Sequence, residues 1–231
     1  MRALLTFTTV LCIAISSLAL AADKYDPYFI EKRALKKEYK RIALAPVESG
    51  ASLAMPESAK QAIEKQITQH LKKRGYIVIP SSILADIRKT MVDQVGGFRD
   101  PNTGEIDAAK VSAVRDHSWR ELWFRHDFDA VATTRVAIIN APIENDKAEW
   151  DGVSQKVKKK GRGLKYTATV AASTVTLSIY DERERPLYVN YGGLEVLMMR
   201  EKTEFKPLDP STFFQDEKRI RKAVSIAVKP I

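Results

Sequence analysis

The chain has 231 residues, a formal net charge of +9 and a single cysteine, Cys12, which lies in the apolar stretch at its start. This length is enough to bury a hydrophobic core in one large domain or two small ones. The cysteine count excludes a disulfide framework, thiolate metal ligands and a cysteine nucleophile downstream of that stretch.

The first 21 residues have the layout of a removable secretory signal. Arg2 supplies a positive charge, an uncharged apolar run extends from Ala3 to Leu20, and Ala19-Leu20-Ala21 places small residues where the peptidase needs them. We therefore expect residues 1–21 to be cleaved and the mature protein to be periplasmic. The alternative is a membrane anchor formed by the uncleaved signal, since the run is about as long as the shortest spanning helix.

Lipidation is not expected, because Leu11 stands before Cys12 where a lipoprotein signal carries a small residue. No second apolar stretch approaches spanning length, so we expect no transmembrane span in the mature chain. Residues 22–40 are charged and mixed, and they predict an arm that leads into a single α/β domain over residues 41–231.

The domain is expected to begin with a strand-helix-strand unit. Arg41 to Val47 predicts the first strand and Tyr76 to Pro80 the second. Between them, apolar residues recur at helical spacing up to Gly75: Ala59, Ile63, Ile67 and Leu71. Such a unit is the usual route to a parallel pair of strands.

Two helices and a strand are predicted next. The first helix ends at Gly96-Gly97, the second begins at Asp107, and Asp129 to Asn140 is rich in the residues that strands favour. The apolar or small residues expected to face inward on the helices are Ile83, Ile87 and Met91, then Val111, Val114, Ser118 and Leu122.

The last third of the chain shows the clearest alternation. Lys165 to Asp181 predicts a half-exposed strand with Val175, Leu177 and Ile179 on its buried side and Thr174, Thr176 and Ser178 on the other. A charged turn then leads to a strand from Leu187, with Gly192-Gly193 marking a bend or bulge, and Asp209-Pro210 is expected to open a final helix. The fold class expected is α/β (α+β): a mixed sheet that starts with a β-α-β unit, continues into antiparallel strands and is packed by amphipathic helices.

The sequence lacks the motifs that would indicate an enzyme of a familiar class. GxSxG, HExxH, the phosphate-binding GxxxxGK[ST] and a GxGxxG after a strand are all missing, and the three histidines, His70, His117 and His126, do not predict a shared site. We therefore expect no catalytic residue, no cofactor and no metal. The alternative is a hydrolase without a familiar signature that uses Asp127, Asp129 or Asp151.

One short segment holds most of the excess positive charge. Six cations fall within ten residues with no acid among them: Lys156, Lys158, Lys159, Lys160, Arg162 and Lys165. Such a segment attracts lipid phosphates, lipopolysaccharide or an acidic protein face, and it is also typical of a solvated hairpin tip. Nucleic acid is not expected, because export removes it as a partner and no aromatic residue interleaves the cluster.

Several stretches resemble a family of uncharacterised exported proteins of Gram-negative bacteria: Ile42-Ala43-Leu44-Ala45-Pro46-Val47, Tyr76-Ile77-Val78-Ile79-Pro80, Asp129-Ala130-Val131, Trp150-Asp151-Gly152-Val153 and Tyr191-Gly192-Gly193-Leu194-Glu195. More distantly, the chain is similar to small envelope α/β domains, among them the amino-terminal domain of the Tol-Pal system's periplasmic protein, the curli secretion lipoprotein and the lipoproteins that activate peptidoglycan synthases. The resemblance implies a mixed sheet backed by helices and an adaptor role in envelope assembly or transport.

Together these observations predict a non-catalytic periplasmic accessory protein that binds another envelope component, with the six cations as the candidate contact for an anionic partner. A structural subunit of an oligomeric secretion assembly is the other alternative.

Overall fold

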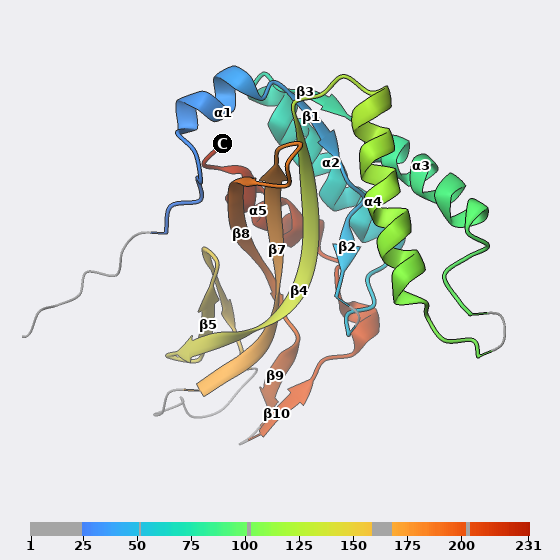
Figure 1. The fold of residues 1–231 in the computed structure, drawn as a ribbon. Helices are drawn as coiled ribbons and strands as arrows, with labels where there is room; N and C mark the ends of the chain where they lie inside the picture. Colours follow the sequence, from blue (N-terminus) through green and yellow to red (C-terminus); the bar gives the residue numbers. More distant parts are fainter. Residues whose placement is uncertain (1–24, 51, 101–102, 159–167, 202–203) are drawn as a thin grey trace, which may run out of the picture.

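The computed structural model describes residues 25–50, 52–100, 103–158, 168–201 and 204–231, and it has an α/β fold in which a mixed sheet lies between helices (Figure 1). The helices are α1 (Lys32–Glu38), α2 (Glu57–Lys73), α3 (Ser81–Gln94), α4 (Ala108–Arg125) and α5 (Glu217–Val228), with a 3-10 turn at Pro210–Thr212. The strands are β1 (Arg41–Leu44), β2 (Glu48–Ser49), β3 (Ile77–Ile79), β4 (Ala130–Glu144), β5 (Lys147–Trp150), β6 (Val153–Lys156), β7 (Ala168–Tyr180), β8 (Pro186–Val196), β9 (Met198–Glu201) and β10 (Glu204–Pro207).

Strand β4 is the centre of the sheet. On one edge it pairs with β1 and β2 in parallel, and β1 pairs in parallel with β3, which confirms the predicted β-α-β unit. On its other edge β4 pairs antiparallel with β7 from Val131↔Tyr180 to Ile143↔Ala168, and β7 pairs antiparallel with β8. The predicted change from parallel to antiparallel pairing therefore takes place across β4.

Helices cover the two faces of the sheet unequally. Helices α2 and α5 lie over the larger core, to which β7 contributes Val175, Leu177 and Ile179, all buried as predicted. Helices α3 and α4 lie over a smaller cluster that includes Leu84 and Leu122. Alternation along β4 separates the two: Ala132 and Val136 belong to the larger core, and Val131 to the smaller one.

A hairpin closes the far end of the sheet, and the sequence did not predict it. A two-residue turn at Asp151 and Gly152 joins strands β5 and β6, and the φ angles of these two residues are 41° and 77°. The hairpin folds over β8, where the side chain of Gln155 donates to the Leu194 carbonyl at 2.7 Å and accepts from the Val196 amide at 3.2 Å. Strands β4, β5, β6, β8 and β7 thus surround a second core, and we call this region the closed end.

The two consecutive glycines of β8 allow close contact on both faces. A register shift in the β7–β8 pairing at Ser173/Thr174 confirms the bulge predicted there. A Cβ at Gly192 would lie 2.8 Å from the carbonyl carbon of Ala223 in α5, and one at Gly193 would lie 2.8 Å from Nε1 of Trp150 in the hairpin. Only glycine admits both neighbours at these separations.

The start of the described chain lies along the outer edge of β8. The Phe29 amide donates to the Leu187 carbonyl at 3.1 Å, and the Val189 amide donates to the Pro27 carbonyl at 2.9 Å. Residues 1–21, which the sequence identifies as a signal, lie outside the described residues. No helix in the described ranges combines the length and apolar character needed to cross a bilayer.

The final helix begins later than predicted. Asp209 caps the 3-10 turn through the Ser211 amide at 2.9 Å, and α5 opens only at Asp216, whose carboxylate accepts from the Lys218 amide at 2.9 Å. Between the two caps Phe214 has a φ angle of 62°, which interrupts helical geometry. The prediction from Asp209-Pro210 was wrong because Asp209 caps only the 3-10 turn. The α-helix is capped by Asp216, further along the chain.

Candidate functional site

The predicted basic contact is partly placed by the structure. Lys156 and Lys158 are described, whereas Lys159, Lys160, Arg162 and Lys165 lie outside the described residues. Lys156 is exposed at the end of β6 and pairs in register with the exposed Lys147 of β5. Like charges directly opposite each other on a hairpin are unfavourable, and the exposed Glu149 of β5 lies on the same face as this pair.

Lys158 differs from Lys156 in its surroundings. Its Nζ lies 3.5 Å from Oδ2 of Asp146, and its side chain is only 10% exposed. The neighbouring Val157 is buried, donates its amide to the Asp146 carbonyl at 3.0 Å and accepts from the Arg200 amide at 2.7 Å. These contacts hold the chain in place where the basic segment begins.

The other flank of the segment is held at the same place. Ala168, the first residue of β7, pairs with Ile143 near the end of β4, and Ile143 also pairs with Ala148 of β5. Both described flanks of residues 159–167 therefore lie at the closed end, beside the β4–β5 turn that contains Asp146.

The three aspartates considered for a hydrolase are not brought together. Asp127 and Asp129 both bind Arg41: Oδ2 of Asp129 accepts the Arg41 amide at 2.8 Å, and Oδ2 of Asp127 lies 3.3 Å from its guanidinium. Asp151 instead accepts the hydroxyl of Thr174 at 2.5 Å in the hairpin turn. Thr174 pairs with β4 six residues beyond Val131, which is roughly 20 Å along a strand.

The turn contact also explains a deviation from the predicted alternation. Thr174 and Ser178 were expected on the exposed side of their strand, but both are buried, and Asp151 covers Thr174. The hydroxyl side of β7 is therefore only partly open to solvent.

The three histidines lie on separate elements. His70 is in the last turn of α2 beside Arg74, and burial together with the charges of Arg74 and Lys73 lowers its pKa. His117 lines a hollow on α4, and His126 ends that helix. Among the described residues, no group of three or more His, Cys, Asp or Glu side chains is arranged to hold a metal ion.

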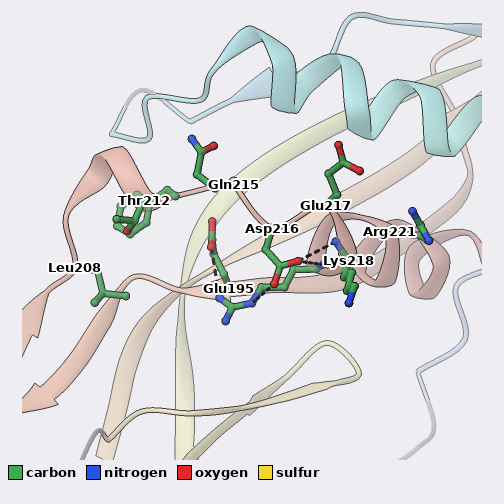
Figure 2. Close-up of a pocket in the computed structure, with 10 residues that line it drawn as sticks. Glu195, Leu208, Thr212, Gln215, Asp216, Glu217, Lys218 and Arg221 are labelled. Atoms are coloured by element: carbon green, nitrogen blue, oxygen red, sulfur yellow. Dashed lines mark hydrogen bonds and ion pairs between the residues drawn. The ribbon is translucent and has the colours of Figure 1, made fainter.

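A cleft that the sequence did not predict lies where α5 begins (Figure 2). It has a volume of about 880 Å³, and it is lined by Glu195, Leu208, Thr212, Phe213, Gln215, Asp216, Glu217, Lys218, Arg219 and Arg221. Its central group is Glu195 of β8, which is 4% exposed. A buried carboxylate in a cleft is a recognised indication of a functional site.

The carboxylate of Glu195 has two different surroundings. Its Oε1 accepts the Phe214 amide at 2.7 Å, and its Oε2 lies 3.7 Å from the guanidinium of Arg219. Burial raises the pKa of Glu195, while the Phe214 amide and Arg219 oppose the rise. Arg219 is shared, because its Nε also lies 3.3 Å from Oδ2 of Asp216.

The bulge in β8 explains why the sequence did not reveal Glu195. With regular alternation, Glu195 would share the hairpin face with Gly193. The extra residue at the bulge turns it to the α5 face instead, opposite the buried Ser173, whose hydroxyl donates to the Glu195 carbonyl at 3.2 Å. A Gly-Gly pair followed by a carboxylate was the available signal, but only the register shows where the side chain goes.

Comparison with known proteins leaves the family open: no family model and no curated protein matches the chain, so the resemblance to a family of exported proteins stays a prediction. Among solved structures, a PelC dodecamer from Paraburkholderia phytofirmans is similar at 8% identity and a TM-score of 0.36, over 84% of this chain and 89% of that one. A neuraminyllactose-binding hemagglutinin homolog from Helicobacter pylori is similar at 12% identity and a TM-score of 0.31, over 80% and 81% of the two chains. These scores are too low for either similarity to bear on what the protein does.

Proposed function

We propose that this protein is a non-catalytic accessory protein of the bacterial envelope, exported to the periplasm, which binds an anionic envelope component through the basic segment from Lys156 to Lys165. The anionic group is a lipid phosphate, as in phospholipid or lipopolysaccharide. Six cations without an intervening acid create a local positive potential that such phosphates neutralise.

The observation that carries the proposal is the anchoring of this segment at the closed end. Val157 and Ala168 are held by backbone hydrogen bonds and strand pairing on either side of it. Lys147 and Lys156 add two exposed cations on the adjoining hairpin, on the same face as Glu149. Both described flanks of the segment therefore lie at the closed end, beside the exposed Lys156.

The experiment removes charge without disturbing the anchor. Lys156, Lys159, Lys160, Arg162 and Lys165 are replaced by glutamine, and Lys158 is retained because its side chain binds Asp146. Binding of the mature chain to vesicles of phosphatidylglycerol and phosphatidylcholine, and to lipopolysaccharide, is measured by co-sedimentation. A basic residue near an anionic surface contributes about 1 kcal/mol, so we expect the five changes to weaken binding at least about a hundredfold.

A control variant matches the loss of charge at another place. It carries glutamine at five exposed lysines of α1 and α2: Lys36, Lys37, Lys65, Lys72 and Lys73. We expect it to bind vesicles nearly as well as the wild type. An equal loss of binding in both variants would mean that net charge alone draws the protein to the anionic surface. Unchanged binding in the first variant would show that the basic segment is not the contact.

Export is tested separately. Cell fractionation followed by amino-terminal sequencing of the recovered protein is expected to find it in the periplasm beginning at Ala22. Recovery of the full-length chain from the cytosol would contradict the proposal, because phospholipid headgroups of the outer leaflet and lipopolysaccharide would then be out of reach.

A further inference from the structure

We propose that the cleft at the start of α5 is a second binding site, which takes a ligand carrying a primary ammonium group on an aliphatic stem. The site is independent of the basic segment, since it is formed by Glu195 and Arg219 and not by any of the six cations. The ligand is either a free alkyl diamine or the lysine side chain of a protein partner.

The first argument is the state of the Glu195 carboxylate. Its side chain is 6% exposed, and its Oε1 is satisfied by the Phe214 amide. Its Oε2 lies 3.7 Å from Arg219, which exceeds the separation of a charge-assisted hydrogen bond, about 2.7–2.9 Å. An ammonium group at Oε2 would bring three donors together with the opposite charge.

The second argument is that Arg219 is held away from closer contact. Its Nε lies 3.3 Å from Asp216, and Asp216 is itself fixed as the cap of α5 through the Lys218 and Arg219 amides. The Arg219 side chain is 47% exposed, so much of it faces solvent. A smaller cation can approach Glu195 without breaking the cap.

The third argument is the shape and lining of the cleft. Leu208 and Phe213 provide apolar contacts for an aliphatic stem, and Thr212 and Gln215 provide polar groups. In the view of Figure 2, Asp216 lies between Glu195 and the side chains of Lys218 and Arg221. The volume of about 880 Å³ is within the range of small-molecule sites.

The backbone of Phe214 indicates that the position of the Glu195 carboxylate is fixed by the fold. A phenylalanine with a φ angle of 62° is rare, and such backbone strain persists where surrounding contacts hold it. Here the holding contact is the hydrogen bond from its own amide to Glu195. Through this hydrogen bond Phe214 orients the carboxylate, with Oε2 on the side of Arg219.

The test is calorimetric titration of the mature protein with 1,5-diaminopentane and with Nα-acetyl-lysine amide at neutral pH, where both carry ammonium groups. The wild type is expected to show saturable binding below about 10 mM. Glu195→Gln keeps a carbonyl oxygen for the Phe214 amide but removes the charge, and we expect binding at least about tenfold weaker. Tighter binding of the lysine amide identifies a protein partner as the source, and tighter binding of the diamine identifies a free ligand.

Two further variants keep the test decisive. Glu38→Gln removes an exposed carboxylate of α1, outside the cleft, and is expected to change the affinity less than about twofold. Arg219→Gln removes the competing cation and is expected to tighten binding, even where Glu195→Gln fails to fold. The proposal is overturned by absence of saturable binding to the wild type, by equal binding to Glu195→Gln, or by unchanged or weaker binding to Arg219→Gln.

Discussion

Replacing Gly192 by alanine tests how tightly α5 is packed on the sheet. The backbone at Gly192 does not have a positive φ angle, so alanine adds a methyl group without adding strain of its own. That methyl would lie 2.8 Å from the carbonyl carbon of Ala223 and 3.2 Å from its Cα, and it would overlap the carbonyl oxygen. These are backbone atoms, and they move only if α5 moves.

The expected magnitude follows from what α5 contributes. Overpacking of this kind costs about 1–3 kcal/mol by itself. A displaced helix also partly exposes Ile220 and Val224, each worth about 1.5–3 kcal/mol when fully buried, and strains the hydrogen bond of 3.0 Å from Asn190 to the Ile226 carbonyl. We expect a loss of roughly 3–5 kcal/mol, a large part of the stability of a typical domain.

The assay is urea unfolding followed by tryptophan fluorescence and far-UV circular dichroism. Gly75→Ala is the control, because Gly75 has a φ angle of 90° with no atom within 4 Å of the added methyl, so it reports backbone strain of roughly 1–2 kcal/mol without a clash. A free energy of unfolding for Gly192→Ala within about 1 kcal/mol of the wild type, with an unchanged denaturant slope, would refute the packing argument.

Three further predictions use the same unfolding measurement. Ser118→Ala should stabilise the protein by about 1 kcal/mol, because the buried Ser118 hydroxyl has no hydrogen-bond partner among the described residues; destabilisation would show that the hydroxyl is bonded. Burial raises the pKa of Glu195, so wild-type stability should decline as pH rises from about 4.5 through the folded value, and Glu195→Gln should flatten this dependence. For Asp181, burial raises the pKa but hydrogen bonds from Arg185 and Arg183 outweigh it and leave the pKa lowered, so Asp181→Asn should destabilise at neutral pH and converge with the wild type as pH falls below about 3.8; a constant difference across pH would contradict this reasoning.

The sequence predicted those elements whose hydrophobic pattern is local. Ile63, Ile67 and Leu71 recur at helical spacing and are buried on α2, and the alternation of Val175 and Leu177 identifies β7. Each pattern spans several turns or residue pairs, so one local signal is repeated often enough to be read without knowledge of the rest of the chain.

What the sequence did not predict depends on contacts between distant residues. Strands β5 and β6 have four residues each, too few for a clear pattern. They are stabilised by Trp150, which donates to the Ser173 carbonyl at 3.1 Å, and by Gln155, which donates to the Leu194 carbonyl of β8. The Glu195 cleft depends on a bulge and on a loop that returns almost twenty residues later. Asp151 was considered as a catalytic group because an aspartate occurs both in turns and in active sites, and the sequence alone does not distinguish the two.

The arm along β8 has a consequence for the two alternatives of export. Tyr25 is tied to β8 by its hydroxyl, which donates to the Val189 carbonyl at 2.7 Å, and by its ring, whose centroid lies 5.6 Å from that of Tyr191. Only three residues separate Tyr25 from residue 21, so the distance between the two is at most about 14 Å. An uncleaved leader would therefore hold this side of the domain against the lipid headgroups in one orientation, whereas cleavage would free the molecule to diffuse and rotate.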